Sequence, residues 1–204
     1  MRDKLIFAGV FAAGFGILGA SYMNLMSVNA DTAVPEDHSG PVMVIETAGE
    51  ATGTMRIALR DDLAPNHVEQ IVTLAEQGEY DGVVFHRVID GFMAQTGDVQ
   101  HGRLDGTPRL WGTGGSDLPN LQAEFTNTPF ERGVVGMARS QSPDSANSQF
   151  FIMFAPAPSL DGQYTVIGQL IEGYDVLDEI KRGTGGNGAV VGEPDRMERV
   201  TIER

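Results

Sequence analysis

Short apolar runs separated by turn residues dominate the chain from residue 42 onwards. Runs of five to seven residues that alternate, or are apolar throughout, are typical of β-strands. They are residues 42–46, 54–59, 83–89, 92–96, 134–138, 150–154, 165–170 and 197–202. The 26 glycines and 10 prolines supply turns between them. Strands this short bury their apolar side chains only by pairing, so the pattern predicts a mainly β domain.

Two stretches have the spacing of helices instead. One begins at Pro65, a residue favoured in the first helical turn, and ends near Gly78. The other covers residues 174–182. Their predicted apolar faces are Val68, Ile71, Val72 and Ala75 in the first and Val176, Leu177 and Ile180 in the second. Seven or eight strands with one early and one late helix fit a closed antiparallel barrel capped at its ends, with a glycine-rich loop region over residues 97–120.

The first thirty residues have the composition of a targeting segment rather than of a folded element. A weakly basic start, residues 1–4, precedes 26 uncharged residues, and small residues stand at 28–30. This pattern is typical of a signal peptide cleaved after Ala30. The alternative is an uncleaved membrane anchor, because such a stretch could just span a bilayer. Either way we expect residues 31–40 to be a linker and residues 41–204 to be a domain in the periplasm, secreted through the inner membrane or anchored to it.

Charge and residue usage exclude several function classes. A net charge of −14 repels phosphate backbones, so we expect no nucleic-acid partner. The absence of cysteine excludes disulfides and thiolate catalysis, and the four histidines lack metal-ligand spacing. Residues 14–19 and 183–188 match G-x-G-x-x-G but lack its strand-to-helix context, and the second match reads as a helix stop followed by a flexible loop. We expect no cofactor, no metal and a monomer.

Residues 85–98, Phe-His-Arg-Val-Ile-Asp-Gly-Phe-Met-Ala-Gln-Thr-Gly-Asp, resemble the signature segment of the cyclophilins. Further pieces of that family's pattern follow in order at 112–115, 136–139, 148–152, 160–162 and 166–168. The resemblance covers essentially residues 42–203. It implies an eight-stranded antiparallel barrel with two capping helices, a site on the outer face of the barrel, and peptidyl-prolyl cis–trans isomerase activity on proline-containing polypeptides.

The resemblance also implies roles for particular residues. Its catalytic set falls on Arg87, Gln95 and Phe92, with Gln95 supporting Arg87. The substrate-binding positions fall on Ile89, Met93, Ala138, Arg139, Gln149, Phe151, Leu160 and Tyr164. Within this set, Phe92, Met93, Phe151 and Leu160 form the implied proline pocket. Ser159 departs from the tryptophan of many eukaryotic members, Tyr164 replaces a histidine, and residues 99–111 are longer than in compact members.

The chemistry of prolyl isomerisation suits these residue types. A twisted X–Pro amide has a free lone pair on nitrogen, and an always-charged, multi-donor guanidinium favours that twisted state. Phe150 and Phe151 are adjacent on a strand, so one faces the interior and the other can face a ligand. The alternative function is a chaperone module that binds proline-containing segments with little catalysis.

Overall fold

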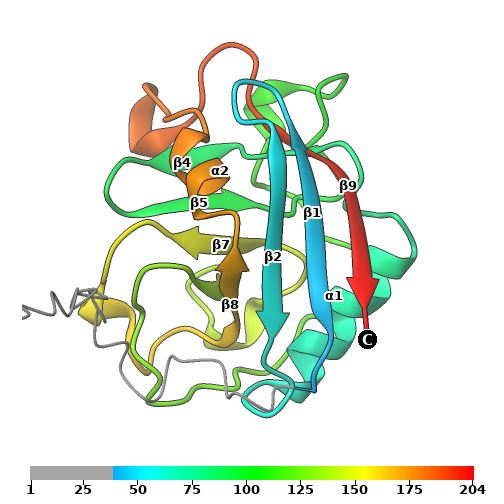
Figure 1. Ribbon diagram of the computed structural model, residues 1–204, viewed down its shortest axis with the longest axis vertical. Helices are drawn as coiled ribbons and strands as arrows, with labels where there is room; N and C mark the ends of the chain where they lie inside the picture. Colours follow the sequence, from blue (N-terminus) through cyan, green and yellow to red (C-terminus); the bar gives the residue numbers. More distant parts are fainter. Residues whose placement is uncertain (1–38) are drawn as a thin grey trace, which may run out of the picture.

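A computed structural model describes residues 39–204 and places them in one nine-stranded antiparallel sheet with two α-helices (Figure 1). The helices are α1 (Pro65–Glu76) and α2 (Tyr174–Glu179). The strands are β1 (Val42–Ala48), β2 (Gly53–Leu59), β3 (Val83–Val84), β4 (Arg87–Ile89), β5 (Met93–Thr96), β6 (Val134–Met137), β7 (Phe150–Met153), β8 (Val166–Glu172) and β9 (Arg196–Glu203). The mainly β prediction is confirmed. The predicted signal or anchor, and the linker up to residue 38, lie outside the described residues.

The sheet is an open half-barrel, so the prediction of a closed eight-stranded barrel is wrong. Its strand order is β3-β9-β1-β2-β8-β6-β7-β5-β4, with β3 and β4 at the two edges. These edge strands come from one run, residues 83–89, which breaks at Phe85 and His86. There the Phe85 amide donates to the Asp195 carbonyl at 2.8 Å, and the His86 carbonyl accepts from the Val190 amide at 3.0 Å.

The helices pack against the sheet through the faces that their sequences indicate. The α1 helix packs on β9 and buries Val68, Ile71 and Ala75, while Val72 is only partly buried. The α2 helix packs near β2 and ends at Glu179, three residues before its predicted end. It ends there because Ile180 turns to an extended ψ of 126° and the Lys181 amide donates to Asp195 Oδ2 at 2.7 Å. Among residues 39–204, neither helix is long and apolar enough to cross a bilayer.

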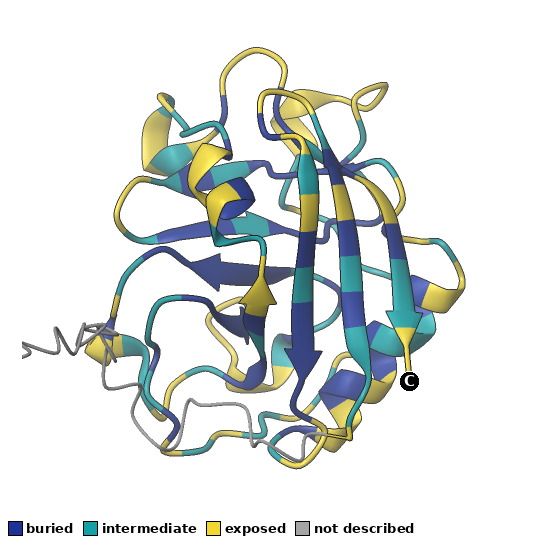
Figure 2. Cartoon of the chain, viewed as in Figure 1, coloured by how far each residue is buried: buried dark blue, intermediate teal, exposed yellow. Residues whose placement is uncertain are grey.

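Strands in the two halves of the sheet differ in how many of their side chains are buried. Along β1 buried and more exposed residues alternate, as in a sheet with one wet face (Figure 2). All residues of β6 and β7 are buried, because both of their faces are covered. One face, with Val135, Phe150 and Ile152, joins the large buried cluster that we call the inner core. The other belongs to a smaller group, the outer cluster, formed by Met93, Phe130, Val134, Phe151, Met153, Ala157 and Val166.

Candidate active site

Arg87 and Gln95 lie opposite one another in the β4–β5 hairpin. The register pairs them directly, so both side chains emerge on the same face of the sheet. Arg87 Nη1 donates to Gln95 Oε1 at 3.1 Å. The turn between the strands contains Gly91 with φ of 66°, a conformation that favours glycine. The hairpin therefore fixes the guanidinium beside the amide, as the resemblance implies.

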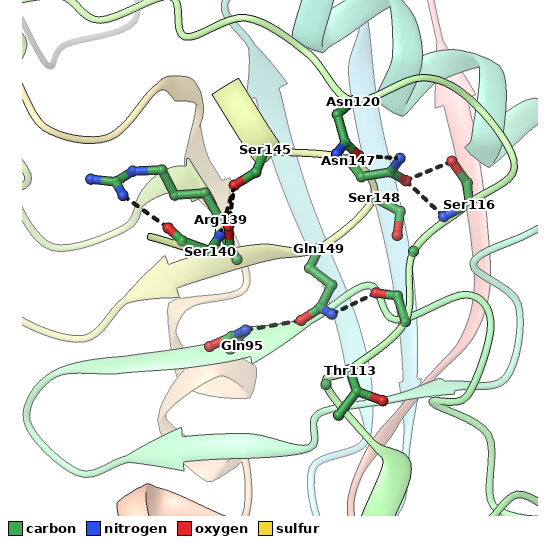
Figure 3. A pocket seen from close by; sticks show the side chains of 14 residues that line it. Gln95, Thr113, Ser116, Asn120, Arg139, Ser140, Ser145, Asn147, Ser148 and Gln149 are labelled. Carbon is green, nitrogen blue, oxygen red and sulfur yellow. Dashed lines mark hydrogen bonds between the residues drawn. The ribbon is translucent and has the colours of Figure 1, made fainter. Parts of the chain in front are cut away.

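A chain of side-chain amides extends this contact. Gln95 Nε2 donates to Gln149 Oε1 at 2.9 Å, and Gln149 Nε2 donates to the Gly114 carbonyl at 2.8 Å (Figure 3). The last acceptor in this series of hydrogen bonds is the backbone carbonyl of Gly114, which cannot rotate away as a side chain could. Each amide is thus oriented by the next, and Gln95 presents its oxygen to Arg87.

Beside Arg87 lies a hollow of about 170 Å³ that both apolar and polar side chains line. Nine side chains line it, and all nine were predicted site residues: Arg87, Phe92, Met93, Gln95, Ala138, Arg139, Phe151, Leu160 and Tyr164. Of the two other predicted residues, Gln149 lies in the neighbouring groove. Ile89 packs against the outer cluster and does not line the hollow.

The floor of this hollow is aromatic. Phe151 stacks on Phe130 with ring centroids 5.8 Å apart, and Tyr164 meets Phe151 edge-on at 5.8 Å. Phe151 comes close to Gly136 on β6, where an added Cβ would lie 2.6 Å from Phe151 Cζ and 2.6 Å from Phe130 Cε1. The missing side chain at Gly136 therefore leaves the space in which the two rings stack.

Arg139 forms one wall of the hollow without presenting its charge to the floor. Its guanidinium lies 4.4 Å from the Tyr164 ring centroid, and its Nη2 donates to the Gln163 carbonyl at 3.0 Å. The cation stacks on the aromatic face and fixes the ring orientation. Tyr164 therefore acts in the wall through its ring, where the family pattern has an imidazole.

A polar groove of about 450 Å³ adjoins the hollow on the side of Ala138 and Arg139 (Figure 3). The groove is lined on one side by the loop of residues 112–116, and residues 147–149 contribute to its lining as well. Asn147 Oδ1 accepts from both the amide and the hydroxyl of Ser116, each at 2.7 Å. The groove and the hollow share Gln95, Ala138 and Arg139 in their linings, so the two are continuous.

Asp98, which sequence reasoning did not select, shapes that loop. Its carboxylate is fully buried and accepts three backbone N–H bonds, from His101 at 2.9 Å, Gly112 at 2.7 Å and Gly114 at 3.1 Å. A carboxylate that accepts several amides compensates for its own burial. The only signal in the sequence was its place at the end of the signature segment, directly after Gly97.

Arg87 is half-buried, and its other contacts come from a segment far along the chain. Burial lowers the pKa of its guanidinium, and nearby Tyr164 partly offsets this. Arg87 Nε donates to the Asn187 carbonyl at 3.0 Å and Nη2 to Asn187 Oδ1 at 3.2 Å. Asn187 lies in the glycine-rich stretch 183–188, which the sequence predicts to be a helix stop and flexible loop. The structure places this stretch against Arg87, a contact that the prediction does not include. Its one usable signal was an asparagine between glycines, a residue that tolerates positive φ.

The inserted segment, residues 99–111, lies on the other side of Arg87. Trp111 lines a further hollow of about 400 Å³ with His86, Arg87, Gln95 and Asn187. Trp111 Nε1 donates to the Arg103 carbonyl at 3.1 Å, which fixes the indole. The insertion thus borders the site. Within residues 39–204, no cluster of three or more histidine, aspartate or glutamate side chains could hold a metal ion.

Comparisons with known proteins agree with this geometry. Residues 42–202 match the family described as "Cyclophilin type peptidyl-prolyl cis-trans isomerase/CLD". A Brucella suis protein named "Probable peptidyl-prolyl cis-trans isomerase" is 55% identical over 154 residues, which span 74% of this chain and 78% of that protein. An Arabidopsis thaliana peptidyl-prolyl cis-trans isomerase is 36% identical over 150 residues, 74% of this chain and 90% of its own.

Solved structures show the same likeness. A cyclophilin from Hirschia baltica matches with a TM-score of 0.63 and 27% identity, covering 78% of this chain and 73% of that one. A Cryptosporidium parvum cyclophilin-type isomerase, crystallised in the presence of the dipeptide Ala-Pro, matches with a TM-score of 0.67 and 25% identity. It covers 80% of this chain and 99% of that one.

Proposed function

This chain belongs to the cyclophilin-type peptidyl-prolyl cis–trans isomerases, and we propose that it accelerates X–Pro rotation in polypeptides exported to the periplasm. Its enzyme class follows from the family. The observation that carries the proposed mechanism is the position of Arg87, a half-buried cation beside a hollow with an aromatic floor.

The reaction needs no nucleophile. Amide resonance sets a barrier of about 18–20 kcal/mol, and the enzyme must bind the twisted amide better than either planar form. At the twist the prolyl nitrogen loses resonance and gains a lone pair. A donor aimed at that nitrogen stabilises only the twisted state, so it lowers the barrier rather than merely tightening binding.

In the proposed complex, the proline ring occupies the hollow over Phe151 and Arg87 donates to the prolyl nitrogen. Phe92, Met93 and Leu160 hold the ring by apolar contact while the preceding residue rotates. One charged hydrogen bond in a partly dry site is worth about 1.5–3 kcal/mol, or about ten- to a hundredfold in rate. The hollow's shape and the exclusion of water supply the remainder.

A protease-coupled peptide assay tests the role of Arg87. We expect Arg87→Ala to lower kcat/KM about ten- to a hundredfold, because the donor to the twisted amide is lost. Arg199→Ala is the matched control, because Arg199 is exposed on β9, lines neither the hollow nor the groove, and its substitution removes the same charge. The control should stay within about twofold of wild type. Equal rates for wild type and Arg87→Ala would overturn the mechanism.

The alternative, a proline-segment-binding chaperone with little catalysis, is tested with a proline-containing client whose refolding is not limited by prolyl isomerisation. If aggregation of that client is slowed equally by wild type and by Arg87→Ala while both lack isomerase activity, the chaperone function replaces the catalytic one. The ordered contact between Arg87 and Gln95 favours catalysis, since a holdase needs no oriented cation.

Export is supported by the uncharged stretch over residues 5–30 and its small residues at 28–30. N-terminal sequencing of the protein from a periplasmic fraction should give a chain that begins at Asp31. Recovery of the intact chain from the membrane fraction would favour the anchor, and intact protein in the soluble cytosol would overturn export.

A further inference from the structure

The glycine-rich segment 183–190 lies along the outer edge of β4. The Gly183 amide donates to the Val88 carbonyl at 2.8 Å, the Val190 amide donates to the His86 carbonyl at 3.0 Å, and Ala189 forms an antiparallel bridge with Arg87. The fit is close, because a Cβ added at Gly188 would lie 2.3 Å from Ile89 Cγ1. The segment is thus built against the strand that carries Arg87.

Asn187 has an unusual backbone conformation within this segment. With φ of 56°, it is the single non-glycine residue of positive φ among residues 39–204. A left-handed conformation costs energy for any residue with a Cβ, although asparagine tolerates it better than most. Such strain persists where the surroundings impose it, and it is common at functional sites. Here it directs both the carbonyl and the side chain of Asn187 towards Arg87.

The guanidinium is held from two sides. Asn187 accepts from Nε through its carbonyl and from Nη2 through Oδ1, while Gln95 Oε1 and, at 3.8 Å, Met93 Sδ accept from Nη1. A guanidinium has five N–H donors in a fixed plane, so these contacts define its orientation. Nη2 has one further proton to donate. Because the plane of the guanidinium is fixed, the direction of that N–H bond is fixed as well.

These oxygen acceptors are all uncharged. No carboxylate forms an ion pair with Arg87 among residues 39–204, whereas Arg60 pairs with Asp62 at 2.7 Å and Arg132 with Asp178 at 2.9 Å. A carboxylate would hold the guanidinium more tightly but would also cancel most of its field at the substrate. Amide acceptors orient the cation and leave its charge available.

We propose that Asn187 is a positioning residue for isomerisation, and that Arg87 works because Asn187 and Gln95 orient it through neutral acceptors only. The proposal rests on the role of Arg87 given above. It assigns a function to the segment 183–188, whose residues line neither the hollow nor the groove and take no part in the amide hydrogen bonds from Gln95 to Gly114.

Two substitutions separate orientation from charge. Asn187→Gly keeps the positive φ and the backbone carbonyl but removes Oδ1, so the on-enzyme isomerisation rate should fall about fivefold with peptide affinity within about twofold. Asn187→Asp keeps the shape and an acceptor but adds a negative charge, so the rate should fall about tenfold or more. Exchange NMR on a proline-containing peptide measures rate and affinity separately.

Asn127→Asp is the matched control, because it makes the same charge change at an exposed position away from the hollow and the groove. It should match wild type, and thermal unfolding should show that all variants stay folded at the assay temperature. If wild type itself gives no acceleration, the proposed function fails. If wild type is active and both Asn187 variants lie within about twofold of it, the positioning role is overturned. An Asn187→Asp variant as fast as wild type, beside a slow Asn187→Gly, would overturn the requirement for neutral acceptors.

Discussion

The inner core and the outer cluster lie on opposite faces of the same strands, β5 and β7, and they differ in how they end. Most of the inner core is fully buried, as Phe150 and Ile152 are, and a few partly buried side chains cover its margin. The outer cluster ends in partly buried side chains, Phe92, Leu160 and Tyr164, around a hollow. A sheet face that is apolar but left partly uncovered is a binding surface, because an entering ring completes its packing.

The adjacent phenylalanines of β7 give the sharpest test of this contrast. Phe150→Ala leaves a closed cavity and should lower the free energy of unfolding by about 3–5 kcal/mol with little change in activity per folded molecule. Phe151→Ala leaves a depression that water can enter, so its stability loss should be smaller while kcat/KM falls strongly. Denaturant unfolding and peptide assays on both variants measure this. Equal stability losses with equal activities would remove the distinction between the clusters.

His86, which lies between β3 and β4, should make the free energy of unfolding fall at acidic pH. Burial, the largest cause, lowers its pKa to about 4, with Asp98 opposing this and Arg87 adding to it. Because the unfolded chain takes up a proton near pH 6.5 and the folded chain only near pH 4, this group destabilises the fold as pH falls through that window. At about 1.4 kcal/mol per pKa unit, the loss is about 3 kcal/mol.

The substitution His86→Phe keeps a planar ring beside Gly112 and cannot titrate. Urea unfolding of both proteins between pH 7 and pH 4 isolates the contribution of His86, since the carboxylates are common to both. The difference in unfolding free energy should move in favour of the variant as pH falls. A constant difference across that range would show that His86 does not carry the effect.

Glycines on neighbouring strands allow a smaller test. Gly136→Ala pushes a methyl group between the rings of Phe130 and Phe151, whereas Gly168→Ala pushes one against the Ala58 carbonyl and Ile57 on β2. Each should cost about 1–3 kcal/mol of stability by overpacking. Only Gly136→Ala should also lower kcat/KM, because it deforms the floor of the hollow. An unchanged kcat/KM in that variant would mean that the stacked rings do not shape the site.

The smallest expected effect is at Tyr164. If it serves as an aromatic wall under Arg139, Tyr164→Phe should stay within about twofold of wild-type kcat/KM. Tyr164→Leu, which removes the ring, should bind peptide more weakly. A large loss in Tyr164→Phe would instead assign the hydroxyl a direct role with the substrate.

Sequence patterns predicted the elements of the fold well and its closure poorly. Apolar runs and helix periodicity located all the long strands and both helices, because those signals are local. The run 83–89 looked continuous, and only the distant Asp195 and Val190, which bond to Phe85 and His86, divide it into β3 and β4. Those partners lie more than a hundred residues along the chain, where no periodicity reports them.

The site divides in the same way. The residues around the hollow came from ordered motifs on neighbouring strands, so a resemblance could place them together. Asp98 and Asn187 were missed because their roles depend on where long loops settle. Asp98 holds a loop in place through buried hydrogen bonds to its backbone amides. Asn187 contacts Arg87, from which it is separated by 100 residues of sequence.

The bonds from Gly183 to Val88 on β4 and from Val190 to His86, just before β4, also cover this edge of the sheet. They occupy carbonyls at an edge that would otherwise offer a template to the strand of another molecule. Damage that detaches this segment would free the guanidinium and uncover the edge in one event. A disabled catalyst would then be prone to aggregation, so the loss of activity and the onset of precipitation would share a single cause.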